Sequence, residues 1–334
     1  MFNYVANLLA LPSIKNAFVQ GLKQQRTFMQ QTIDIDLQDI QKNIDDSLSE
    51  KDFKKINDYY GYAVPAILGE AFCLLRGQAM ITRERHAMTY LGALTGLFDD
   101  FFDEKKTSKE HIKVLLDAPD ESNAMNAHQR LIIRLFRHAL AHLDEPEVLK
   151  SYCDQVYDAQ LWSNKQSEHT PLTREELQQI TCVKGGVSFL YYRTALGPCH
   201  DKIEEQMLYN FGSISQLEND MFDVYKDMKN NVQTLATTAH HIYTLRTYYT
   251  KLTEETFALA RQTNYPKANQ QKFLRFAALI IARGYVCLDV LEQAARKSNG
   301  IFSPTTYQRS DLICDMEKTT NRLKLLHYYA KTSI

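Results

Sequence analysis

Nowhere does the sequence alternate apolar and polar side chains over a useful length, the pattern typical of a half-buried β-strand. It also contains no strand-turn-strand signal and no internal repeat. Helix breakers are few, because the 334 residues include only 12 glycines and 8 prolines. We therefore predict an all-α fold of roughly ten helices.

No change of composition along the chain resembles a linker. We expect a single helical domain over residues 1–334, although a division into two domains also fits this length. The helices expected from the pattern cover residues 1–31, 35–49, 52–76, 82–104, 110–117, 123–143, 145–167, a long stretch after Thr173, 201–230, 233–263, 267–298 and 304–331.

The charge balance argues against nucleic acid as a partner, because 39 Lys and Arg residues stand against 40 Asp and Glu residues. Six scattered cysteines without a C-x-x-C pair are typical of reduced thiols in a cytoplasmic protein. No apolar run reaches the ~18 residues of a membrane-spanning helix. The amphipathic stretch at residues 1–25 lacks the features of a signal peptide, and we expect it either to cap the bundle or to make a weak contact with a membrane surface.

Carboxylates gather at the end of the largely apolar stretch from residue 90 to 104, YLGALTGLFDDFFDE. On a helix, Asp99 and Asp103 lie one turn apart, as do Asp100 and Glu104. Acids this close repel one another, and burial raises their pKa values unless cations neutralise them. The stretch is therefore either the polar end of an ordinary helix or one half of a site for a divalent metal.

A second acidic stretch, QLENDMFDVYKDMKNN, lies far downstream and favours the metal interpretation. Asn219, Asp223 and Asp227 recur every four residues and share one stripe of a helix, with Asp220 beside them. Two acidic stripes facing each other would supply the oxygen ligands that Mg²⁺ prefers. Lys226 then either pairs with these carboxylates or projects toward a bound diphosphate.

Two adjacent glycines, Gly185 and Gly186, lie inside a predicted helix, where each costs about 1 kcal/mol relative to alanine. Close packing against a neighbouring helix, or a kink, would explain them. Alternatively, the helix is interrupted there and exposes backbone groups to a cavity. Lys184 and Arg193 would then reach an anionic ligand.

The motif D-D-x-x-D at residues 99–103, together with Asn219, Asp223 and Asp227, resembles the class I isoprenoid synthases, the superfamily of terpene cyclases, prenyl elongases and squalene or phytoene synthases. The layout of GEAFCLLRGQ before the first motif is similar to the bacterial large terpene synthases, near the squalene synthase-like branch. The resemblance implies a helical bundle around a central cavity, a prenyl diphosphate substrate, three Mg²⁺ ions and, frequently, a homodimer.

The same resemblance assigns roles to individual residues. It implies metal binding by the acids and the amide of the two motifs, namely Asp99, Asp103, Asn219, Asp223 and Asp227, with Asp100 completing the first motif. Three cations would bind the substrate diphosphate, namely Lys184, Arg193 and Lys226. The cavity that stabilises the carbocation would be lined by Phe98, Phe102, Gly185, Tyr191, Tyr192 and Phe222.

The sequence departs from the family patterns at both motifs. Cyclases commonly carry Ser or Thr and then Glu where this chain has Asp223 and Asp227. Two aspartates at these positions resemble the second aspartate-rich motif of elongases. Elongases, however, usually carry arginines soon after the first motif, where this chain has Lys105 and Lys106. We therefore expect a Mg²⁺-dependent cyclase, a lyase that releases diphosphate. The alternatives are a prenyltransferase that joins two prenyl units and a non-catalytic helical binding protein.

Overall fold

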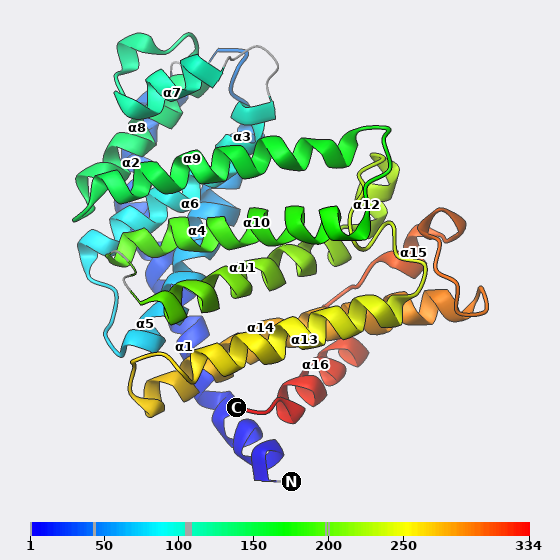
Figure 1. Ribbon diagram of the computed structural model, residues 1–334. Coiled ribbons are helices and arrows are strands. Elements are labelled where there is room, and N and C mark those ends of the chain that lie inside the picture. Colours follow the sequence, from blue (N-terminus) through cyan, green and yellow to red (C-terminus); the bar gives the residue numbers. More distant parts are fainter. Residues whose placement is uncertain (1, 43–44, 104–108, 198, 200) are drawn as a thin grey trace. The chain divides into compact units, whose positions relative to one another are not determined.

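The computed structural model describes residues 2–42, 45–103, 109–197, 199 and 201–334, without the side chains of residues 2–3, 34–36, 39, 99–103 and 109. Every regular element in these residues is helical, and none is a strand, so the predicted all-α class is confirmed (Figure 1). The α-helices are α1 (Phe2–Gln31), α2 (Ile33–Lys42), α3 (Glu50–Lys54), α4 (Gly61–Ala63), α5 (Glu70–Arg76), α6 (Thr82–Asp103), α7 (Lys109–Asp117), α8 (Ala127–Ala141), α9 (Pro146–Ser163), α10 (Arg174–Arg193), α11 (Lys202–Phe222), α12 (Val224–Lys229), α13 (Ile242–Ala260), α14 (Lys267–Arg296), α15 (Arg309–Leu312) and α16 (Thr319–Lys331).

Two compact units emerge from the contacts within the chain. The N-terminal unit comprises residues 13–157 and 191–199, and the C-terminal unit comprises residues 1–12, 158–190 and 200–334. The expectation of one domain over residues 1–334 stays a prediction. In the described part of the chain, no helix is both long enough and apolar enough to cross a membrane.

Helix α6 forms the core of the N-terminal unit. Buried apolar side chains lie around most of the circumference of this helix, and they include Ala87, Met88, Leu91, Leu94 and Leu97. Helix α8 packs against it, and so does α4 together with its flanking π-helical segments η1 (Lys55–Tyr60) and η2 (Val64–Gly69). Because apolar side chains surround α6, the helix is held in place along most of its length.

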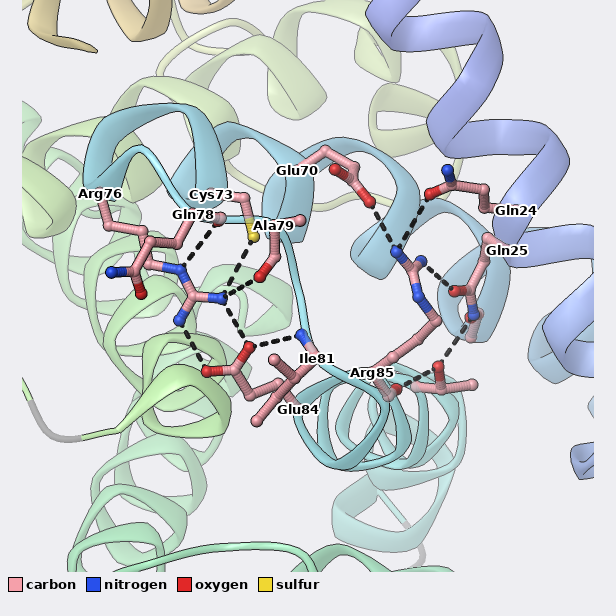
Figure 2. A network of polar contacts seen from close by, with 12 residues as sticks. Gln24, Gln25, Glu70, Cys73, Arg76, Gln78, Ala79, Ile81, Glu84 and Arg85 are labelled. Carbon is pink, nitrogen blue, oxygen red and sulfur yellow. Dashed lines mark hydrogen bonds and ion pairs between the residues drawn. The ribbon is translucent and has the colours of Figure 1, made fainter.

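A partly buried ion pair fixes the turn between α5 and α6 (Figure 2). Helix α5 ends at Gly77, whose φ of 74° is a left-handed conformation that favours glycine. Across the turn, the guanidinium of Arg76 donates to both carboxylate oxygens of Glu84, at 2.6 and 2.5 Å. The same carboxylate accepts the backbone N–H of Ile81 at 2.9 Å, so it also satisfies an amide at the start of α6.

Replacing Glu84 with alanine is expected to lower the free energy of unfolding by about 2 kcal/mol, because it leaves the largely buried guanidinium of Arg76 without its bidentate partner. Urea denaturation measures the change. Arg83→Ala is the matched control. The side chain of Arg83, next to Glu84 in the sequence, pairs with Asp144 in an exposed position, and such a pair contributes little to stability. Equal destabilisation by both substitutions would contradict this account of the turn.

Helix α14 is the core of the C-terminal unit, in which α11, α13 and α16 all pack against it (Figure 1). The hydroxyl of Tyr249 on α13 donates to the carbonyl of Ile281 on α14 at 2.8 Å. The ring of Tyr328 on α16 stacks on that of Tyr285 on α14, with the ring centroids 5.1 Å apart. Aromatic contacts therefore tie α13, α14 and α16 into one layered group.

Several expected helices are shorter than predicted. The helix expected over residues 35–49 corresponds to α2, which ends at Lys42, and residues 45–49 are not helical. The helix expected over residues 233–263 begins only at Ile242, because Thr234 and Thr237 each bond the other's backbone N–H through the side-chain hydroxyl, at 3.1 and 2.7 Å. The helix expected over residues 304–331 is divided into η6 (Pro304–Thr306), α15 and α16. In the first turn of α16, the side chain of Asn321 donates to the carbonyl of Asp315 at 2.7 Å and stabilises the turn that precedes the helix.

Candidate metal and diphosphate site

The two glycines of α10 lie at a close crossing with α11 inside the C-terminal unit. A Cβ atom built on Gly185 would lie 2.1 Å from the carbonyl oxygen of Gly212, and one built on Gly212 would lie 2.0 Å from that of Gly185. A Cβ on Gly186 would meet the ring of Tyr209 at 2.4 Å. Helix α10 runs through both glycines without a break, so the prediction of an interrupted helix is wrong. The alternative, close packing against a neighbouring helix, is confirmed.

Asn219, Asp223 and Asp227 follow one another along a continuous helical path. Helix α11 ends at Phe222 and α12 begins at Val224, yet the backbone hydrogen bonds continue through the junction. The N–H of Asp223 donates to the carbonyl of Asn219, and that of Asp227 to the carbonyl of Asp223, both at 2.9 Å. The three side chains therefore keep the one-turn spacing expected of a stripe. Asn219 is exposed, and the two acids are half-buried.

Asp220 is the buried acid beside this stripe, with 5% of its surface exposed. It accepts hydrogen bonds from Gln216 at 2.8 Å and from the hydroxyl of Thr181 on α10 at 3.3 Å. Burial, with a smaller contribution from the negative charge of Asp227, raises the pKa of Asp220 to about 6. The sequence alone predicts no role for Asp220, which is one of three consecutive polar residues, Glu218, Asn219 and Asp220.

Asp227 also carries a raised pKa, of about 6, because of burial and of the negative charge of Asp223. Two ammonium groups act in the opposite direction. Lys226 forms an ion pair with Asp223 at 3.2 Å, and Lys184 on α10 lowers the pKa values of both Asp220 and Asp227. Lys184 therefore lies near the acidic stripe, on the helix that crosses α11 at the glycines.

The structure pairs Lys226 with a carboxylate, which was one of the two alternatives for this side chain. Its side chain is 69% exposed, so the pair contributes little to stability. Phe222, one of the expected cavity residues, is half-buried in the same unit, with the guanidinium of Arg283 5.2 Å from its ring centroid. The assignments of Lys226 to a diphosphate and of Phe222 to a cavity stay predictions.

The first acidic motif belongs to the N-terminal unit. The backbone of α6 carries it, but the side chains of Asp99, Asp100, Phe102 and Asp103 lie outside the described part of the structure. Phe98, just before them, is buried with 3% of its surface exposed.

The remaining predicted residues of this unit lie at the end of α10. Tyr191 and Tyr192 are both buried, and the hydroxyl of Tyr192 lies 2.6 Å from that of Thr95 on α6. Arg193 is 9% exposed and donates to the carbonyl of Gly197 at 2.7 Å. In this structure Arg193 therefore stabilises the turn after α10, and its predicted contact with a diphosphate is untested.

The donor set on α11 and α12 suits Mg²⁺ by its chemistry. Asn219 offers an amide oxygen, and Asp223 and Asp227 offer carboxylates, which are the hard ligands that this ion prefers. The raised pKa of Asp227 reflects its burial and, second, the negative charge of Asp223, which a bound cation would offset. Among the described side chains, no group of three or more His, Cys, Asp and Glu is arranged to hold a metal.

No protein-family model matches the sequence, and no curated protein matches it significantly. The assignment of function therefore depends on the motifs and on the chemistry of their surroundings.

The raised pKa of Asp220 predicts a pH-dependent stability. Its ordinary pKa of 3.8 applies to the unfolded chain, so between pH 4 and pH 6 the folded protein binds the proton more tightly. Stability of the metal-free protein should therefore increase as the pH falls from about 7 to about 5, by about 1 kcal/mol from this group. Asp220→Asn should remove this contribution, because asparagine does not titrate. Urea denaturation at both pH values compares the two proteins, and parallel pH profiles would contradict the prediction.

Proposed function

We propose that the protein is a Mg²⁺-dependent class I terpene synthase, which ionises a linear prenyl diphosphate and cyclises or quenches the carbocation. One observation carries the proposal: Asn219, Asp223 and Asp227 keep a continuous one-turn spacing beside the cation of Lys184. The order of the two motifs along the chain, first on α6 and then on α11–α12, also supports the proposal, because it resembles that of class I isoprenoid synthases.

The residues of the chain would divide the work in the following way. Asn219, Asp223 and Asp227 would hold Mg²⁺ through their oxygens, and the resemblance implies the same task for Asp99 and Asp103. Bound Mg²⁺ would supply Lewis-acid stabilisation of the leaving diphosphate. The cationic side chains of Lys184, Lys226 and Arg193 bind the negative charge of the diphosphate, the first of them with the best support from its surroundings.

Aromatic side chains would exclude water and stabilise the positive charge after the diphosphate leaves. Phe98, Tyr191 and Tyr192 are buried, and Phe222 is half-buried, so their rings are shielded from solvent as this task requires. The ring of Tyr192 is oriented by its hydroxyl contact with Thr95. Phe102 has the same task by resemblance alone.

The test is incubation of the purified protein and Mg²⁺ with one allylic diphosphate, with and without isopentenyl diphosphate. Substrates of graded chain length are compared, and gas chromatography identifies the products. The proposal predicts a hydrocarbon or terpene alcohol from the allylic substrate alone, with release of diphosphate. A product that forms only with isopentenyl diphosphate would contradict it.

The second candidate is a prenyltransferase, and a specific feature favours it. Aspartate at both Asp223 and Asp227 is the pattern of the second elongase motif rather than that of most cyclases. The same incubation distinguishes the two, because coupling requires two substrates. If no substrate is turned over while Mg²⁺ and diphosphate still bind, the protein is a helical binding protein instead.

A further inference from the structure

Two cysteines from different elements of the C-terminal unit lie next to each other. Cys287 is on α14, and Cys314 is in the non-helical segment between α15 and α16. Their thiols hydrogen-bond to each other, and neither cysteine forms a disulfide. Cys287 is 0% exposed, whereas Cys314 is 6% exposed, so Cys314 is the one that reaches the surface. The proposed function uses neither thiol.

Cys314 is held against α14 by contacts on both sides of it in the sequence. Before it, Asp311 forms an ion pair at 2.7 Å with Lys297, the residue that follows α14. After it, the carbonyl of Asp315 accepts the side chain of Asn321 at 2.7 Å. A disulfide requires the two sulfur atoms to approach to about 2.05 Å. Since Cys314 lies outside a helix, its backbone can make this small adjustment without breaking helical hydrogen bonds.

The surroundings make Cys314 the more reactive of the two thiols. The hydrogen bond from Cys287 lowers the pKa of the Cys314 thiol, although burial opposes this effect. The cations of Arg283 and Lys324 also lower this pKa, and the carboxylate of Glu218 acts in the opposite direction. The same hydrogen bond, together with burial, raises the pKa of the Cys287 thiol. Because the thiolate is the form that attacks an oxidant, Cys314 would react first.

A neighbouring cation alone does not have this effect on a thiol of the chain. Cys73 on α5 lies 3.6 Å from a guanidinium nitrogen of Arg76, yet burial raises the pKa of the Cys73 thiol to about 11. The contact with a second thiol therefore distinguishes Cys314 from Cys73. A cysteine of lowered pKa beside a second thiol that can resolve its oxidised form is typical of redox-active pairs.

We propose that Cys287 and Cys314 form a redox-active dithiol, which hydrogen peroxide converts to an intramolecular disulfide. The thiolate of Cys314 attacks one peroxide oxygen, the O–O bond breaks, and a sulfenic acid forms while hydroxide leaves and takes up a proton. The sulfur of Cys287 then attacks the sulfenic sulfur, the S–O bond breaks, and the departing hydroxide takes the thiol proton of Cys287. Two thiols and one peroxide thus give one disulfide and two water molecules, and two electrons pass from sulfur to oxygen. The disulfide would join α14 to the segment before α16.

Peptide mapping of the full chain after peroxide treatment tests this inference. Trypsin cleaves after Lys and Arg, so the two cysteines fall in separate peptides, residues 284–296 and 310–318. In the folded protein, peroxide should link mainly these two peptides, and dithiothreitol should separate them again. In concentrated urea this selectivity should disappear, because the fold no longer holds the thiols together. Absence of the link in the folded protein, or equal linkage to the peptides of the other cysteines, would overturn the inference.

Substitutions test the order of attack. Cys287→Ser removes the second thiol, so the sulfenic acid of Cys314 should accumulate, and its labelling by dimedone should increase by at least about tenfold. Cys314→Ser should slow the oxidation of Cys287 by at least about tenfold. Equal rates of thiol oxidation in the two variants would contradict the assigned roles.

Cys73→Ser is the matched control, because it replaces a buried thiol beside a guanidinium but outside the pair. This variant should form the link between residues 284–296 and 310–318 as the unsubstituted protein does. Circular dichroism checks that each variant is folded. If a variant of the pair is not, the peptide map of the unsubstituted protein decides alone.

Discussion

If the protein has the proposed function, Asp223→Ala should reduce Mg²⁺-dependent diphosphate release by on the order of a hundredfold to a thousandfold, because it removes a proposed oxygen ligand of the metal. The fold should survive the change. Asp223 raises the pKa of Asp227 by its negative charge, so its removal relieves repulsion in the metal-free protein. The measurement is the steady-state rate of diphosphate release at saturating Mg²⁺, combined with a thermal unfolding curve.

Glu175→Ala is the control for this variant. Glu175 is an exposed carboxylate at the start of α10, in the same unit but away from the acidic stripe. The substitution Glu175→Ala removes one negative charge, as Asp223→Ala does, and should leave the rate of diphosphate release unchanged. Equal rates for Asp223→Ala and Glu175→Ala, with both proteins folded, would remove the stripe from the mechanism.

A methyl group on Gly185 should lower the free energy of unfolding by about 3 kcal/mol, the upper part of the range for overpacked cores. The reason is the 2.1 Å separation between the added Cβ and the carbonyl oxygen of Gly212, a backbone atom that cannot rotate away. Helix propensity alone predicts the opposite sign, a gain of about 1 kcal/mol for Gly→Ala inside a helix. Urea denaturation of Gly185→Ala therefore decides between local propensity and packing.

Ser188→Ala provides the comparison for Gly185→Ala. Ser188 lies one turn farther along α10, half-buried, with its hydroxyl bonded to the carbonyl of Lys184 at 2.7 Å. This substitution tests a small change in the same helix without a steric clash and should alter stability little. If Gly185→Ala proves as stable as Ser188→Ala, the close crossing of α10 and α11 is not as described.

Local sequence predicted the starts and ends of several helices because their signals are themselves local. Helix α1 matches the range 1–31, and α14 begins at Lys267 as expected. At the start of α10, Thr173 and Glu176 bond each other's backbone N–H through their side chains, at 3.2 and 2.7 Å, which is a capping box. Such signals lie within a few residues of the boundary that they determine.

Contacts between distant segments could not be predicted from the sequence. The two glycines of α10 indicated a close approach, but nothing near them named Gly212 as the partner. The same limit applies to Asp220, one of several consecutive polar residues, since only packing shows that it is buried while Asn219 is exposed. The division of the stretch 304–331 depends on the bond from Asn321 to Asp315, which helix periodicity does not encode.

The proposed function requires the two acidic motifs to bind one magnesium diphosphate together. Titration calorimetry of Mg²⁺ and inorganic diphosphate tests it most directly, using Asp99→Asn, Asn219→Ala and the double variant in a thermodynamic cycle. If the motifs share the ligand, each single substitution should cost most of the affinity, and the double variant should bind little worse than either. Binding losses that simply add, or diphosphate binding that does not depend on Mg²⁺, would show that the motifs act separately and would contradict the account.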